Sequence, residues 1–455
     1  MRACFLLLFS VALLPGQSTD EEFRVYTDHP RLFLKAQHLR LLKRERERQS
    51  MRWLQFETLV KGVAQMPEPG FAYGLYYAVT GDATFGKKAV EWAMGSTSDV
   101  RQVALVYDWC QALLTPEQSK SLANKLVPAA QQAKSDDVRA VRTRALAAIA
   151  VSERLPDGGE SSMRDIVQGW WRKKASAALA EGRDFAPGDE QLALMELVHA
   201  VRDNLTIDFR DSAADYFRQL PSFYVSSHYP APYAAAENEY RIPFYKNAGQ
   251  PDLDRAAASR AAGLMMVAFD TNAVENQFVQ GWLMQDRFLL KGAYGCPYEY
   301  MWANPYQPGL SYFHLPMAFY DKRSGALFVR SDWEEDATWF GMFQDEMQLF
   351  RDGKITVLHT GNMNAGAIPT YAVGDTAMIA LGRPQARFQA QGGAVFVVHL
   401  KPRHVYEVEI DDEEMAEFET DPAGTLYLPI PKEHSPGIRI RERNQTSWMR
   451  QSANL

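Results

Sequence analysis

The sequence predicts a chain of two main parts, a helical domain followed by a β-domain. Up to about Ser324 the apolar residues recur at the spacing of helices. The pattern then changes, because residues 326–330 form a short apolar run and residues 337–343 form an aromatic run with the composition of a strand. Asp352-Gly353 is a hairpin signal between two further strand candidates. Residues 324–354 are therefore expected to carry the chain into a β-domain that packs on the helical one.

Composition and charge narrow the class of protein. The chain has 455 residues, of which 46% are hydrophobic and 23% are charged, as in ordinary globular proteins. The formal net charge is -7, which argues against a nucleic-acid partner because phosphate binding needs a basic surface. An acidic polysaccharide remains a candidate partner, since a local basic patch can lie on an acidic protein.

The N-terminus has the features of a secretory signal peptide. Met1-Arg2 precede an apolar stretch that is too short to span a bilayer, and residues 1–18 are the expected signal. No later stretch predicts a membrane span, so we expect a secreted or periplasmic protein. The remaining cysteines, Cys110 and Cys296, permit either a disulfide or two buried free thiols. Their spacing does not suit a metal site, and neither a metal nor a cofactor is expected.

The helical part divides into short helices with recognisable ends. Residues 71–82 predict a helix that ends at Gly81, and residues 100–114 predict another. Thr115 is the expected N-cap of the next helix, and Gln118 completes a capping box with it. Later helices are expected at 162–181, 188–202, 252–270 and 277–291. Residues 294–309 are expected to form an aromatic, proline-rich connector at the wall of a cleft.

Several short sequence motifs occur in the order in which one protein family has them. They are His-Pro-Arg-Leu at 29–32, Tyr-x-x-Thr-Gly-Asp at 77–82, Tyr-Asp-Trp at 107–109, Leu-Leu-Thr-Pro-Glu at 113–117 and Ala-Leu-Phe-Val-Arg-Ser-Asp-Trp at 326–333. In these motifs the chain resembles the heparinase II/III-like polysaccharide lyases. The resemblance implies a multidomain α and β fold, with an incomplete α/α toroid at 24–312, a β-sandwich-like domain at 318–443 and a tail at 444–455. It also implies a carbohydrate-active protein that cleaves uronate-containing glycans by β-elimination.

The expected site lies in residues 224–245, where polar and aromatic side chains are densest. The resemblance implies that a Tyr on such a stretch protonates the leaving oxygen, and Tyr240 is the candidate. Arg241 and Asn238 are candidates for neutralising the uronate carboxylate, and His314, near the domain junction, is a further candidate for the base. The expected substrate-binding residues are Tyr107, Trp109, Tyr233, Glu239, Tyr245 and Trp302.

Other interpretations of these residues stay open. Tyr107 and Trp109 also suit the core between inner helices, and residues 224–245 also suit a polar loop whose carboxylates pair with Arg241. Where the lyases have an Asn or an Asn-His pair at the start of a helix, this chain has residues 188–190, Gly-Asp-Glu. Where they have a histidine-rich run, it has residues 341–347, which contain no His. One alternative function is therefore a glycan-binding protein without catalysis.

A second alternative is a glycoside hydrolase with paired carboxylates. Glu237 or Glu239 would then act against Asp108 or Asp189. In each of these readings the partner is a polysaccharide or oligosaccharide, and neither nucleic acid nor a membrane span is involved.

Overall fold

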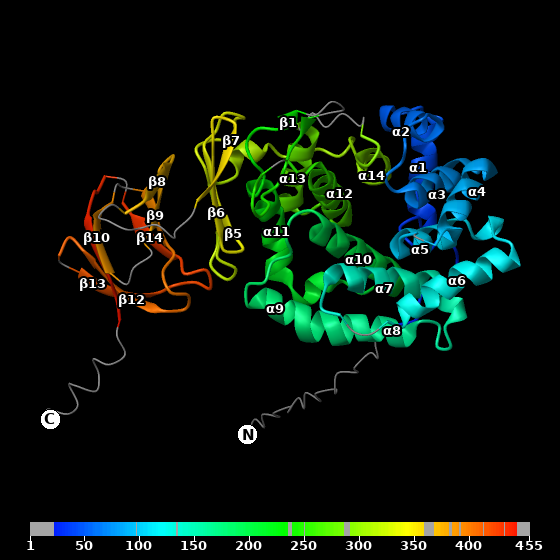
Figure 1. Ribbon diagram of the computed structural model, residues 1–455, viewed down its shortest axis with the longest axis horizontal. Helices are drawn as coiled ribbons and strands as arrows, with labels where there is room; N and C mark the ends of the chain where they lie inside the picture. Colours follow the sequence, from blue (N-terminus) through cyan, green and yellow to red (C-terminus); the bar gives the residue numbers. More distant parts are fainter. Residues whose placement is uncertain are drawn as a thin grey trace, which may run out of the picture.

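The computed structural model describes residues 22–443 except 97, 133–134, 235–238, 250, 286–291, 359–367, 382–384, 391–392, 413 and 432. The predicted signal peptide at 1–18 and the tail at 444–455 lie outside these residues. The predicted fold class is confirmed, because a helical toroid comes first and a β-sandwich-like set of sheets follows it (Figure 1).

The toroid is built on a ring of inner helices that contact one another in chain order. These are α3 (Pro69–Thr80), α5 (Val100–Trp109), α7 (Val138–Ala150), α10 (Asp189–Leu205), α12 (Leu253–Phe269) and α14 (Gly295–Trp302), and α14 also contacts α3. Each inner helix follows an outer one, as expected for paired helices with short connections. The outer helices are α1 (Ala36–Glu47), α2 (Met51–Lys61), α4 (Ala83–Met94), α6 (Pro116–Ala130), α8 (Glu160–Arg164), η3 (Asp165–Ala175), α9 (Ser176–Ala180), α11 (Ala214–Ser226) and α13 (Val274–Gln285).

Local sequence sets several helix ends. Helix α3 ends at Gly81, whose φ of 75° is left-handed and suits glycine. Helix α6 begins with the predicted capping box, in which the Thr115 side chain accepts from the Gln118 backbone and the Gln118 side chain accepts in return from the backbone of Thr115. These signals lie at the chain's surface, where no tertiary contact overrides them.

The prediction for residues 294–309 is wrong in its first half. Gly295–Trp302 is helix α14 of the inner ring, and all of its residues are buried. Pro297 lies in the first turn, where a missing N–H breaks no helical hydrogen bond. Because other elements pack around this helix on every side, its sequence does not divide into an apolar and a polar face. Hydrophobic periodicity therefore could not predict it.

The first sheet packs directly on the toroid. It is an antiparallel meander of β3 (Ala318–Asp321), β4 (Ala326–Arg330), β5 (Trp339–Phe343), β6 (Glu346–Arg351) and β7 (Lys354–Leu358). On β5, Trp339 and Phe343 join the core of the toroid, whereas Phe340 and Met342 join a second core on the other face. Both faces of the sheet are therefore buried, which explains the continuous apolar run in the sequence.

Two further sheets complete the stack. The middle sheet has the order β14 (Leu426–Ile430), β11 (Gly393–Val398), β9 (Thr376–Ala380) and β8 (Thr370–Val373), with β9 and β11 parallel. The outer sheet has the order β10 (Gln385–Gln389), β15 (Gly437–Glu442), β12 (Val405–Ile410) and β13 (Glu414–Glu419). Figure 1 shows the toroid on one side of β5 and β6 and these sheets on the other. The first sheet is thus the layer between the helices and the sandwich.

The open question about the cysteines is resolved in favour of free thiols. Cys110 on the end of α5 and Cys296 in α14 are both buried and form no disulfide. In the described part of the chain, no helix has the length and hydrophobicity needed to cross a bilayer.

Candidate functional site

Residues 224–245, the expected site, begin in the last turn of α11 and continue into a hairpin, of which residues 235–238 lie outside the described part of the chain. Its tip pairs β1 (Tyr233–Ala234) with β2 (Glu239–Tyr240), and Tyr233 lies opposite Tyr240. Nearer its base, the Tyr229 backbone N donates to the Ile242 carbonyl at 3.0 Å. We call residues 227–245 the junction hairpin, because it lies between the toroid and the first sheet.

Side chains of the first sheet hold the base of the junction hairpin. Trp339 Nε1 on β5 donates to the Ser226 carbonyl at 3.0 Å. The Tyr229 hydroxyl donates to Gln348 Oε1 on β6 at 2.6 Å, and Gln348 Nε2 donates to the Tyr245 carbonyl at 2.8 Å. These groups are buried, so each bond is costly to break. The sheet thereby fixes the position of Arg241 relative to the toroid.

Two arginines come together at this junction. Arg330 at the end of β4 is only 5% exposed, donates from Nη2 to the His228 carbonyl at 3.0 Å, and lies 3.9 Å from the Trp333 ring centroid. Arg241 lies over the ring of Trp282 on α13 at 5.4 Å. Burial, followed by the neighbouring charge of Arg241, lowers the pKa of Arg330 to about 9. Among the described residues Arg330 forms no salt bridge.

A phenol and an acidic loop border the arginines. Tyr312, in the short helix η5 (Tyr312–His314), packs edge-on against Trp333 with ring centroids 5.5 Å apart. Burial raises the pKa of Tyr312, while the charge of Arg241 and its hydrogen bond to the phenol act in the opposite direction. Glu335 lies 4.0 Å from Arg241 and its side chain is 60% exposed. We call Arg241, Arg330, Tyr312 and the two adjacent tryptophans the junction site.

The histidine of the hairpin is not available as a base. His228 is 2% exposed, its Nδ1 lies 2.7 Å from the Tyr224 carbonyl, and its Nε2 lies 3.5 Å from Ser259 Oγ. Burial lowers its pKa to about 3, so the ring is neutral near pH 7. His314, the predicted base, is exposed on the same turn as Tyr312. In the described residues no cluster of His, Cys, Asp or Glu is arranged to hold a metal.

The structure places the other residues predicted for the hairpin only in part. Tyr240 and Glu239 form β2, but their side chains lie outside the described residues, as does all of Asn238. Tyr233 is 42% exposed beside them, whereas Tyr245 is 8% exposed and packs against a neighbouring ring. Arg241 is therefore the predicted catalytic residue whose surroundings the structure describes most fully.

Two predicted substrate-binding residues lie in the core of the toroid. Tyr107 is fully buried and its hydroxyl donates to Glu153 Oε1 at 2.9 Å. Trp109 is 6% exposed and its Nε1 donates to the Leu32 carbonyl at 2.8 Å. Both residues therefore belong to the core between the inner helices, because α5 is covered by neighbouring elements on every side. Trp302 belongs to a different region, a cavity described below.

The carboxylate of Asp108 anchors the N-terminal segment. Its oxygens accept from the backbone N of Arg31 and Leu32, and Oδ1 lies 2.6 Å from Nδ1 of His29. Asp108 is 1% exposed. The hydrolase alternative therefore cannot use Asp108 as a catalytic carboxylate, because these contacts fill its acceptor positions. Asp189, the other candidate, is exposed at the first residue of α10.

The sequence reasoning missed Arg330, Tyr312, Trp282 and Trp333. For Arg330 a signal was present, because residues alternate between the faces of a strand and Phe328 faces the toroid. Arg330 therefore had to face the toroid as well, and it lies within residues 326–333, which carry the resemblance. Tyr312 and Trp282 come from separate helices, and only the fold brings them to Arg241.

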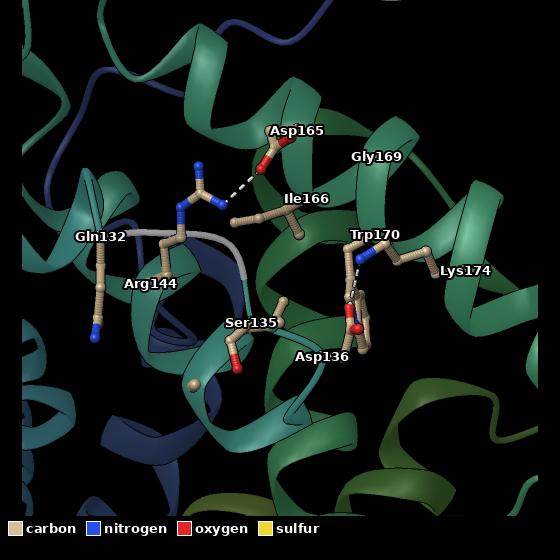
Figure 2. A pocket seen from close by; sticks show the side chains of 11 residues that line it. Gln132, Ser135, Asp136, Arg144, Asp165, Ile166, Gly169, Trp170 and Lys174 are labelled. Atoms are coloured by element: carbon tan, nitrogen blue, oxygen red, sulfur yellow. Dashed lines mark hydrogen bonds and ion pairs between the residues drawn. The ribbon is translucent and has the colours of Figure 1, made fainter.

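Another pocket, between α7 and η3, has balanced charges. Figure 2 shows Arg144 directed at Asp165, with 2.6 Å between Nη1 and Oδ2, and Lys174 directed at Asp136, with 2.8 Å between Nζ and Oδ1. Ile166 and Trp170 line the same pocket, and Figure 2 shows Trp170 beside the Lys174–Asp136 pair. Since each cation has its carboxylate, this pocket offers no unbalanced charge to a ligand.

Comparison with known proteins gives a distant likeness to solved structures and no match of sequence. No protein-family model matches the chain, and no curated protein matches it. Among solved structures, a mutant of the heparan sulfate lyase HepC from Pedobacter heparinus is similar with a TM-score of 0.36 and 10% sequence identity. The likeness covers 83% of this chain and 76% of that chain.

Proposed function

We propose that this protein binds an acidic polysaccharide at the junction site. The observation that carries the proposal is the burial of the Arg330 guanidinium, which is only 5% exposed and lies beside a second arginine, Arg241. Taking a charge out of water is costly unless it is paired. No described carboxylate forms an ion pair with Arg330, and the charge of Asp332 offsets only part of the effect of burial on its pKa. An anion bound between Arg330 and Arg241 would supply the missing charge. Planar guanidinium groups suit the planar carboxylate of a uronate.

The chemistry that fits this arrangement is β-elimination. Arginines against the uronate carboxylate would stabilise the negative charge that develops when the adjacent C–H proton leaves. A base removes that proton, the C–O bond to the leaving sugar breaks, a C=C bond forms, and an acid protonates the leaving oxygen. In the proposal Arg241 neutralises the carboxylate, Tyr240 transfers the proton to the leaving oxygen, and His314 is the candidate base. Asn238 is a further candidate neutraliser.

The experiment follows the ultraviolet absorbance of the unsaturated uronate over a panel of uronate polysaccharides. Wild type is expected to produce it, and Arg241→Gln is expected to lower kcat/KM by about 100-fold, as for loss of one stabilising donor. Tyr240→Phe is expected to abolish turnover with little change in binding. Arg387→Gln, in an exposed pair on the outer sheet, is the matched control. Equal activity of Arg241→Gln and the control would refute the site.

Glycan binding without turnover is the second candidate. The observation that favours it is His228, whose ring is buried and neutral and whose nitrogens both face protein partners. In that case wild type would bind a uronate oligosaccharide, Arg241→Gln would weaken binding, and no absorbance would appear. We also propose export of the protein by the signal at 1–18, which N-terminal sequencing of the exported form would test.

A further inference from the structure

A cavity of about 560 Å³ lies away from the junction site, between α1 and the C-terminal ends of α10, α12 and α14. Its volume is in the range of small-molecule and oligosaccharide sites. Trp302 lies in its wall, with the rings of His38 and His199 at 5.1 and 4.6 Å from its own. Tyr306, 68% exposed, also lines it.

The walls of this cavity are basic, although the whole chain carries a net charge of -7. Its lining holds five Lys or Arg side chains and two carboxylates, which are Lys35, Arg44, Arg48, Arg52, Arg202, Glu45 and Asp203. Each carboxylate already has a cation: Glu45 lies 3.0 Å from Arg52, and Asp203 lies 3.4 Å from Arg202.

The other three cations that line the cavity exceed the number of its carboxylates. Lys35 lies 4.8 Å from the ring centroid of Tyr26. Arg44, in the last turn of α1, and Arg48, the C-cap of this helix, are both exposed. Within the part of the chain that the structure describes, none of the three forms an ion pair. Repulsion among them favours an anionic ligand, because a bound anion would relieve it.

A polar group inside the cavity also lacks a partner. Gln307 donates from Nε2 to the Thr271 carbonyl at 2.7 Å, but its Oε1 is buried and accepts no hydrogen bond from any described residue. A buried acceptor without a donor costs free energy. Rotation of the Gln307 side chain toward the cavity would let this oxygen accept from the hydroxyl of a bound sugar. The aromatic wall and the cationic rim together match an oligosaccharide that carries carboxylate or sulfate groups.

We propose that this basic cavity is a second binding site for an acidic oligosaccharide. Gln307 lines the cavity and Tyr312 belongs to the junction site, five residues further along the chain. Five residues of extended chain span at most about 18 Å, so one long acidic glycan chain can reach both sites, whereas short probes are expected to occupy them separately. The choice of a glycan rests on the proposed function, whereas the preference for an anion rests on the cavity's own charges.

The test is calorimetric titration of the whole protein with a sulfated heparin tetrasaccharide and, separately, with tetragalacturonate. Wild type is expected to bind two molecules of at least one probe. Arg44→Gln/Arg48→Gln is expected to weaken one of the two sites by about tenfold for each arginine, and to leave the other unchanged. Lys87→Gln/Lys120→Gln, which removes two exposed charges from α4 and α6, is the matched control and should retain both sites.

The variants distinguish failure of this inference from failure of the proposed function. Loss of one site in Arg241→Gln together with loss of the other site in Arg44→Gln/Arg48→Gln supports both sites. Loss of binding only in Arg44→Gln/Arg48→Gln supports the cavity and refutes the junction site. Binding by Arg44→Gln/Arg48→Gln equal to that of the control, with an unchanged circular dichroism spectrum, overturns the cavity. No binding of either probe by wild type overturns it as well.

Discussion

The charge network at the centre of the toroid gives a stability prediction that can be worked out from the structure. Glu196 on α10 is 2% exposed, and both of its oxygens accept from Arg101 Nε on α5, each at 2.9 Å. Arg142 on α7 also donates to it. Arg101 Nη1 lies 2.6 Å from Glu68, and its Nη2 donates to the Tyr298 hydroxyl at 2.7 Å. One carboxylate thus links three helices of the inner ring.

The perturbation is Glu196→Gln, which removes the charge and keeps the size of the side chain. Arg101 retains Glu68, but Arg142 has no other ion pair among the described residues. Removing one partner of a buried ion pair typically costs about 3–5 kcal/mol, because a charge is left buried without compensation. The amide also points an N–H group at guanidinium donors, which leaves at least one donor unsatisfied. We therefore expect the free energy of unfolding to fall by about 3–5 kcal/mol.

The assay is urea unfolding followed by far-ultraviolet circular dichroism, which reports on the toroid helices. Asp412→Asn is the matched control, since Asp412 and Arg387 form a pair whose side chains are 61% and 66% exposed. Such an exposed pair contributes about 0–1 kcal/mol. If Glu196→Gln costs no more than this control, the network does not support the ring. Partial recovery in Glu196→Gln/Arg142→Met would show that the isolated cation causes the loss.

Four further outcomes follow from buried and capped groups. Burial opposes ionisation of Glu196, but the two guanidinium charges outweigh it and lower its pKa below 4.5. The free energy of unfolding of the wild type should therefore fall as the pH drops through the lowered pKa, and in Glu196→Gln this dependence on acid pH should be weaker. Burial raises the pKa of Cys110 and Cys296 to about 12, so neither thiol should react with a disulfide reagent at pH 8 before urea is added, and rapid native labelling would contradict their burial. Thr115→Ala should cost about 1 kcal/mol in urea unfolding and Thr115→Ser much less, whereas equal losses would exclude a capping role. Tyr229→Phe loses a buried hydrogen bond to β6 that positions the hairpin, and should weaken glycan binding about tenfold while the fold persists; unchanged affinity would show that the bond does not position Arg241.

The order of helices and strands was predictable because it depends on local patterns. The capping box at Thr115, the stop at Gly81 and the strand at 326–330 are all set by neighbouring residues. Helix α14 was not predictable in this way, because every face of Gly295–Trp302 is covered and no periodic pattern remains. The stacking of the sheets could not be predicted from the sequence either, since it depends on which side chains contact one another between layers.

The candidate site was predictable only where one segment supplies its residues. Arg241 was recognised from the polar density of residues 224–245, and the structure places it beside Tyr312 and Trp282. Those partners lie on η5 and α13, so no single window of sequence contains the site. Spacing alone could not tell the buried Tyr107 from a residue lining a cleft, because both positions favour aromatic side chains.

The balance of charge separates arginines that hold the fold from those that we assign to ligands. Arg101 is buried and shares the carboxylates of Glu196 and Glu68, so its charge is satisfied within the protein. Arg330 is buried to a similar extent, yet it forms no ion pair with a described carboxylate. Its close partners are a carbonyl and an aromatic face, and Asp332 acts on it only through its charge. A cation without a carboxylate reduces stability unless something outside the protein supplies the anion. Replacing Arg330 by Met should therefore cost the free protein much less than Glu196→Gln does, while removing the stabilisation that an acidic glycan confers.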